Sequence, residues 1–323
     1  MGRKKEMLTY LFAILLIFLI YILSKFTFIR FNLFSTSFVA VVLEGLPFLL
    51  LGALISSLIQ IYVPDRFFTG LNKFGFFIGI FIALFLGLFI PLCECSIIPV
   101  VARMIKKGLS PSVGISFMFA APIINPITIL STYNAFFPNY SFAIIRSLGG
   151  AAIVFIMGLF VHFYLKEKVV IKNMSDLKEG HNHNEEDNGS RIKSLPSRTF
   201  NEFASLAVFF IIGSFIAAAL KTYIPQDIIF SLGSSSYLSI ISMMFLAFVL
   251  SICSQADAFI AQSFYGHFTN AALLSFLMYG PMFDIKNTAV LLRNFERKFV
   301  LMMIVLATVL TFGLSVLLNY LGV

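Results

Sequence analysis

The feature that most constrains this chain is a series of apolar segments, each long enough to cross a lipid bilayer. A hydrocarbon core of about 30 Å needs about 20 apolar residues in a helix. Backbone polar groups in lipid must find partners within the chain, so an all-α fold is expected. About nine hydrophobic segments satisfy this length, at residues 7–28, 38–62, 75–92, 111–132, 141–165, 201–223, 235–253, 269–291 and 299–320.

The overall composition points to a polytopic membrane protein. Hydrophobic residues make up 59% of the 323 residues and charged residues 12%, whereas a soluble domain is about half apolar and about a quarter charged. The Lys and Arg residues behind the net charge of +8 lie mainly in loops, where they set membrane topology. We therefore expect a plasma-membrane protein in contact with lipid, and no nucleic-acid partner.

A hydrophilic stretch at 166–200 interrupts the apolar segments and reads as a flexible linker. The predicted organisation is an N-terminal transmembrane helix at 1–30, a first repeat at 38–165, this linker, and a second repeat at 201–323. The linker contains His181 and His183, and the sequence leaves open whether they bind a metal.

The two halves resemble each other at an offset close to 160 residues. Helix-interrupting segments in corresponding positions are the sequence sign of a repeat transporter whose site lies where the repeats meet. The matched features are Gly52 and Pro64 with Gly213 and Pro225, Cys93-Glu94-Cys95-Ser96 with Cys253-Ser254-Gln255-Ala256, and Pro122 to Asn125 with Pro281 to Asp284.

Basic residues indicate how the halves are oriented. If residues 75–107 form a re-entrant hairpin, the N-terminus, the linker and most basic loops share the inner side, as the positive-inside rule requires. The same arrangement makes the repeats antiparallel, so we predict inverted repeats with broken helices and a cytoplasmic N-terminus and linker.

Thiols dominate the candidate site. Cys93 and Cys95 lie between Pro91 and Pro99 at the end of an apolar segment, and we expect the helix to be broken at these two prolines so that its backbone is exposed to the site. Thiolates prefer soft ions such as zinc, copper(I) or trivalent arsenic, and Cys253 would complete a three-thiol metal-binding set. The alternative is that these cysteines are buried apolar filler.

Carboxylates supply the second part of the candidate site. Glu94 and Asp257 each lie within a few residues of a cysteine, where they would bind a cation or carry a proton; the alternative is an ion pair with Lys or Arg. Asn125 and Asp284 each follow a proline by three residues and either face the substrate or cap a helix. Ser96, Ser254, Pro122 and Pro281 complete the expected substrate-binding set.

The run from Pro91 to Thr132 (PLCECSIIPVVARMIKKGLSPSVGISFMFAAPIINPITILST), together with residues 253–259 and 280–284, resembles the YraQ-like predicted permease family (UPF0718-type). That family is related to the organoarsenical efflux permease ArsP. The resemblance implies a multi-pass permease and, in the arsenical branch, thiol recognition of trivalent organoarsenicals. It also implies a small partner membrane protein. The matching positions are Cys93, Cys95, Ser96, Pro122 and Asn125.

The expected function is therefore transport of a small ionic substrate, a soft metal cation or a metalloid compound, without enzymatic activity or a cofactor. No Gly-x-x-x-x-Gly-Lys-Ser/Thr motif for nucleotide binding is present. Two alternatives stay open: a redox enzyme using Cys93 and Cys95, and a scaffold or sensor subunit acting with a partner membrane protein. A homo-oligomer is compatible with either.

Overall fold

The computed structural model describes residues 28–64, 75–89, 93–165, 195–223 and 236–322, together with residues 66, 68, 70 and 72. The predicted helix at 7–28 lies almost wholly outside the described residues, as do Pro91, Pro225, His181 and His183. Of the predicted linker, only 195–200 is described, and it already belongs to a helix.

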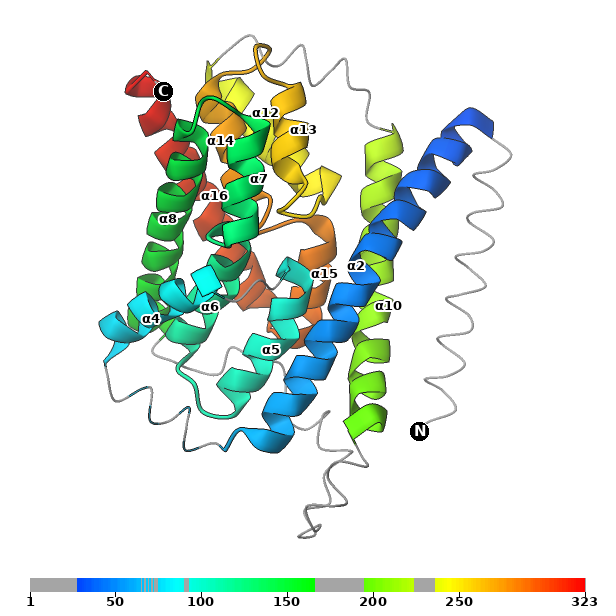
Figure 1. Ribbon diagram of the computed structural model, residues 1–323, viewed down its shortest axis with the longest axis vertical. Helices are drawn as coiled ribbons and strands as arrows, with labels where there is room; N and C mark the ends of the chain where they lie inside the picture. Colours follow the sequence, from blue (N-terminus) through cyan, green and yellow to red (C-terminus); the bar gives the residue numbers. More distant parts are fainter. Residues whose placement is uncertain are drawn as a thin grey trace.

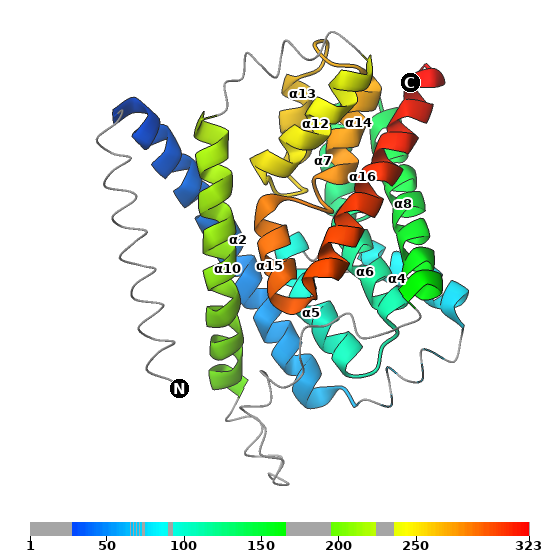
Figure 2. The same ribbon diagram turned by 180° about the vertical axis from the view of Figure 1, so that it is seen from behind.

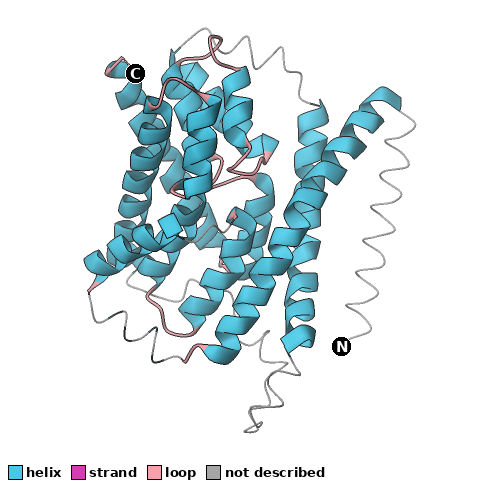
Figure 3. Cartoon of the chain, viewed as in Figure 1, coloured by secondary structure: helices cyan, strands magenta, loops and turns pink. Residues whose placement is uncertain are grey.

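The regular elements of the described residues are helices, which confirms the all-α prediction (Figures 1 and 3). In chain order they are α2 (Phe28–Tyr62), α4 (Phe76–Phe89), α5 (Glu94–Lys106), α6 (Pro111–Ile123), α7 (Pro126–Ala135), α8 (Ser141–Leu165), α10 (Leu195–Tyr223), α12 (Ser236–Leu250), α13 (Asp257–Ser263), α14 (Asn270–Tyr279), α15 (Ile285–Asn294) and α16 (Arg297–Tyr320).

Within these residues, 5 helical stretches are long and apolar enough to cross a membrane: Phe34–Tyr62, Pro111–Ala135, Ser141–Leu165, Leu195–Thr222 and Arg297–Tyr320. Three shorter apolar helices, α4, α12 and α14, accompany them. At 14 residues, α4 is too short to cross a hydrocarbon core that needs about 20. The chain is thus a multi-pass membrane protein that also contains helices of less than membrane length.

Two predicted segments are each divided by a short non-helical link, as their proline and glycine residues suggested. The segment at 111–132 ends one helix at Ile123 and starts another at Pro126, where the missing proline N–H costs nothing. The segment at 269–291 breaks between Tyr279 and Ile285. The prediction was wrong at Pro99, because α5 continues through this residue.

Helices α2 and α10 lie side by side along one edge of the bundle (Figures 1 and 2). Helix α5 packs against α2, and α15 packs against α10. In the rest of the bundle, α4, α6 and α8 form one packed group and α12, α14 and α16 form another. Every residue of α6 is buried, so this helix lies in the core of the bundle.

Two glycines allow the long helices to approach the short ones. A Cβ added to Gly52 of α2 would lie 2.6 Å from the carbonyl oxygen of Ser96 in α5. A Cβ added to Gly213 of α10 would lie 2.7 Å from the Cα of Lys286 in α15. Each close approach fixes the first turn of a short helix, and these two turns carry the candidate site.

Candidate functional site

Three segments converge on a buried polar centre: the first turn of α5, the link between α12 and α13, and the first turn of α15. Glu94 in α5 is 3% exposed, and one of its carboxylate oxygens lies 3.5 Å from the ammonium of Lys286 in α15. Its other oxygen accepts a hydrogen bond of 3.3 Å from the hydroxyl of Ser254. Residues distant in sequence therefore share one carboxylate at the centre of the fold.

The cysteines follow the same convergence. Cys93 precedes the first turn of α5 in an extended conformation, and its side chain interacts with that of Cys253 from the link after α12. Both side chains are buried. The structure thus brings together the two thiols that hold matching positions in the predicted repeats.

Cys95 points elsewhere. Its thiol donates a hydrogen bond of 3.2 Å to the side-chain oxygen of Asn287 in α15. Among the residues that the structure describes, no group of three or more His, Cys, Asp or Glu side chains is arranged to hold a metal ion. The predicted three-thiol set of Cys93, Cys95 and Cys253 is therefore divided between two neighbouring contacts.

Asp284 caps α15 and contributes a second carboxylate to the centre. One oxygen accepts a short hydrogen bond of 2.6 Å from the backbone N–H of Asn287, as an N-cap residue does. The other oxygen lies 3.7 Å from the ammonium of Lys286. The two readings of Asp284, as a cap and as a residue facing the site, therefore both fit its position.

Ser251 adopts a positive φ of 49° at the start of the link that carries Cys253 and Ser254. This left-handed conformation is uncommon for a residue other than glycine. The serine hydroxyl accepts a hydrogen bond of 3.2 Å from the backbone N–H of Ile285. The link is thereby fastened to the first turn of α15, which brings its polar residues to the centre.

Asp257 belongs to a second buried network. Arg146 of α8, which is fully buried, holds both of its carboxylate oxygens, at 2.9 and 2.6 Å. Arg146 also donates to the hydroxyl of Thr132 and to the carbonyl oxygen of Ser254. Asp257 thus forms an ion pair with an arginine, which was the alternative to a role in binding a cation or carrying a proton. Ser254 connects this network to Glu94, because its carbonyl accepts from Arg146 and its hydroxyl donates to Glu94.

The remaining predicted residues are distributed around the centre. Pro281 lines a cavity of about 10 Å³ beside Glu94 and Asn287, a volume close to the minimum for one water molecule. Ser96 donates back to the carbonyl oxygen of Cys93. Asn125 caps α7 through the backbone N–H of Ile127, and the carbonyl of Pro122 accepts from Thr128, so neither side chain has a described contact with the thiols.

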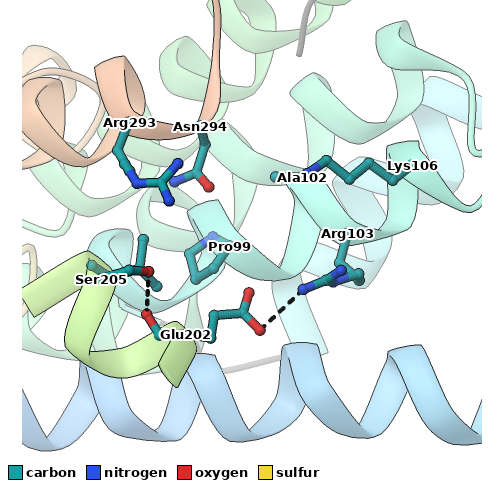
Figure 4. A pocket seen from close by; sticks show the side chains of 9 residues that line it. Pro99, Ala102, Arg103, Lys106, Glu202, Ser205, Arg293 and Asn294 are labelled. Carbon is teal, nitrogen blue, oxygen red and sulfur yellow. Dashed lines mark hydrogen bonds and ion pairs between the residues drawn. The ribbon is translucent and has the colours of Figure 1, made fainter. Parts of the chain in front are cut away.

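A second polar group lies at the opposite end of α5, where Lys and Arg residues gather (Figure 4). Glu202 of α10 forms an ion pair of 3.2 Å with Arg103 and accepts a hydrogen bond of 2.8 Å from Ser56 of α2. Lys106 and Arg293 line the same depression. Burial and the neighbouring charge of Arg103 lower the pKa of Lys106 from 10.5 to about 8.

Arg146, Lys286 and Asn287 contribute to the two buried networks but were absent from the sequence-based prediction. Arg146 lies inside a predicted span, and a charge at such depth is itself a signal of a polar site. Lys286 and Asn287 follow Asp284 closely. In the sequence, these two residues are polar residues near the end of a predicted apolar segment and give no sign of a site. Only the fold shows that this end of the segment lies in the core.

Comparison with known proteins agrees with this architecture. The chain matches the ArsP_1 family, described as "Predicted permease", over residues 30–320. It is 34% identical over 286 residues to YcgR of Bacillus subtilis, covering 88% of this chain and 96% of YcgR. A Streptococcus mutans protein named as a candidate two-component membrane permease complex subunit is 35% identical over 82% of this chain and 87% of its own length.

A shorter match, 26% identical over 117 residues, links the chain to YraQ of Escherichia coli, covering 36% of this chain and 33% of YraQ. No solved structure matches. The family model and the two longer relatives each cover more than four-fifths of this chain. These matches confirm the resemblance found from the sequence motifs. The chain belongs to the ArsP_1 family of predicted permeases.

Proposed function

We propose that this permease moves a soft metal cation or a trivalent metalloid compound through a site formed jointly by its two halves. The observation that carries the proposal is the contact between Cys93 and Cys253, beside the hydrogen bond from Ser254 to Glu94. Two thiols and one carboxylate therefore lie close together, although they are not arranged to hold a metal ion in this conformation. Soft cations and trivalent arsenic favour thiolates over harder ligands, and the carboxylate would balance the positive charge.

The proposal includes two inverted repeats. Helices α2, α4, α5, α6, α7 and α8 would correspond in order to α10, α12, α13, α14, α15 and α16. One pair of contacts between the halves supports this correspondence, because α5 packs against α15 and α7 packs against α13. Glu94 and Ser254 hold matching positions 160 residues apart and touch each other, as residues beside a two-fold axis must. Repeat interfaces are where many transporters place their substrate.

Entry of such a cargo requires movement. The cavity beside Glu94 has a volume of about 10 Å³, which suits a single water molecule rather than a metalloid compound. We infer that the helices carrying the site separate when cargo enters. In this account Cys93 and Cys253 make the first contact, and Cys95 joins them once its hydrogen bond to Asn287 has broken.

Transport assays on bacteria that lack their own copy of the gene test this proposal. Cells carrying the wild type, Cys93→Ser or Cys253→Ser are exposed separately to cadmium, zinc, copper(I), arsenite and methylarsenite, and cell content is measured. We expect the wild type to change the content of at least one of these species and both serine variants to match empty cells. Met157→Leu, which removes a buried sulfur outside the site, is the control and should transport normally. Normal transport by both serine variants at equal membrane abundance would overturn the proposal.

The Streptococcus mutans relative supports one addition. Its name describes a subunit of a two-component complex, and we propose that this chain likewise acts with a partner membrane protein. Affinity purification of the tagged protein from its own membranes should recover one membrane protein in a fixed ratio. If the chain alone transports at full rate in vesicles, the partner is not required and this addition fails.

A further inference from the structure

Lys286 places a buried ammonium between two buried carboxylates. Its exposed fraction is 4%, against 3% for Glu94 and 0% for Asp284. The ammonium lies 3.5 Å from Glu94 and 3.7 Å from Asp284. Burying charges away from water is costly unless they are paired. Because two carboxylates here share one ammonium, the group retains an excess of negative charge when all three are ionised.

The ammonium is held by charge rather than by close hydrogen bonds. Charge-assisted N–H···O bonds are about 2.7–2.9 Å long, and both contacts of Lys286 are longer than this. The Asp284 oxygen that faces the ammonium is buried and accepts no hydrogen bond among the described residues. A cation held at these distances, with a carboxylate oxygen that has no hydrogen-bond donor of its own, is the arrangement expected of a displaceable occupant.

No other buried cation of the described residues can take this place. Arg146, the other buried base among them, is committed to Asp257 through two bonds. The hydroxyl of Ser254 and the backbone N–H of Asn287, which donate to Glu94 and Asp284, are both neutral. The thiols of Cys95 and Cys253 and the carboxylate of Asp257 also lie near Glu94, and none of them is a cation. Lys286 is therefore the group that keeps these carboxylates compensated.

We propose that Glu94 and Asp284 form a cation-binding site of ammonium size, which Lys286 fills as a tethered ion until another cation displaces it. The identity of the displacing cation as the transported cargo rests on the function proposed above. Displacement would link cargo binding to movement, because freeing the ammonium removes the ion pair with Glu94 that joins α5 to α15. Removing one partner of a buried ion pair is strongly destabilising, so the empty site stays closed around Lys286.

Thermal unfolding of the full-length protein in lipid nanodiscs tests the ion site without any assumption about cargo. Lys286→Ala leaves the carboxylates without their cation and opens space beside them. We expect potassium, ammonium and methylammonium chlorides to raise its unfolding temperature by roughly 3 °C or more relative to choline chloride, whose cation is too large. The wild type and Lys286→Arg should not distinguish these salts, because their own side chain occupies the site.

The double variant Glu94→Gln/Lys286→Ala is the matched control, since it lacks one carboxylate and should lose the selective response. The proposed cation site would be wrong if choline and ammonium raised the unfolding temperature of Lys286→Ala equally. It would also be wrong if the double variant kept the full selective increase in unfolding temperature. If Lys286→Ala does not accumulate, Lys286→Met serves in the same salts and is judged by the same criterion.

Cadmium titration, followed by the ultraviolet absorption of the thiolate–cadmium bond, tests displacement itself. Without a competing ammonium, Lys286→Met should bind cadmium roughly tenfold more tightly than the wild type. Unchanged or weaker binding would show that Lys286 does not compete. If cadmium binding is unaffected by Cys93→Ser, the proposed function fails. The cation site at Glu94 and Asp284 is tested separately, by the response of Lys286→Ala to ammonium.

Discussion

Ser254 donates a hydrogen bond of 3.3 Å to Glu94, a residue 160 positions earlier in the chain. The same serine accepts a hydrogen bond through its carbonyl from Arg146. One residue thus connects the carboxylate beside the thiols to the buried Arg146–Asp257 pair. This connection is the reason that we treat the centre of the bundle as one polar site with two parts.

Replacing Gly52 or Gly213 by Ala should destabilise the protein, because the new methyl group would meet backbone atoms of Ser96 or Lys286 at 2.6–2.7 Å. Overpacking of this kind costs about 1–3 kcal/mol. Unfolding temperatures in nanodiscs check this. Gly313→Ala is the control, because nothing lies within 4 Å of its added Cβ, and it should be neutral or stabilising. A neutral effect at both packed glycines would contradict the close helix approach.

Separating Arg146 from Asp257 should be more harmful than removing both charges. Asp257→Asn leaves a fully buried guanidinium without its anion, and breaking a buried pair in this way costs about 3–5 kcal/mol. The double variant Arg146→Met/Asp257→Asn should recover much of that loss. Stability measurements on the two single variants and the double variant form a mutant cycle. Additive losses would mean that the pair is not coupled as the 2.6 Å contact implies.

Membership of the all-helical membrane class was predictable, because apolar runs of membrane length have few other solutions. The breaks near Asn125 and before Ile285 were predictable from proline chemistry. Continuity at Pro99 was not, since packing of α5 against α2 outweighs the missing backbone hydrogen bond of one proline.

The meeting of Cys93 with Cys253 was inferred from the offset between the halves, and the structure brings these two side chains together. The position of Cys95 was not predictable. Residues two apart in one helix point in different directions, so Cys95 reaches Asn287 instead. Lys286 was missed for a similar reason, because no local pattern records which distant carboxylate a lysine will meet.

The protein should become more stable as the pH rises from about 8 towards 10.5, through Lys106. Burial lowers the pKa of this lysine to about 8 in the folded protein, against 10.5 for a lysine in water. Between these values the unfolded chain binds more protons than the folded one, so raising the pH favours folding. Below about pH 8 the charged lysine opposes folding.

Unfolding temperatures of the wild type and Lys106→Gln, measured from pH 7 to pH 10, isolate this effect. We expect the variant to be the more stable at pH 7 and the difference to shrink towards pH 10. Lys298, an exposed lysine at the start of α16, supplies the control variant Lys298→Gln, which should follow the wild type. A constant difference between Lys106→Gln and wild type across this range would contradict the assignment.

In the proposed function, Cys93 and Cys253 together present a two-thiol site to a soft ion. Mercury(II), which bridges two adjacent thiols, tests it in full-length Cys95→Ser protein carrying an inserted protease site within residues 166–194. After mercury treatment and cleavage, denaturing electrophoresis should show the two halves still joined, and a further Cys93→Ser or Cys253→Ser change should separate them. Halves that separate despite mercury treatment, with both cysteines present, would contradict the account.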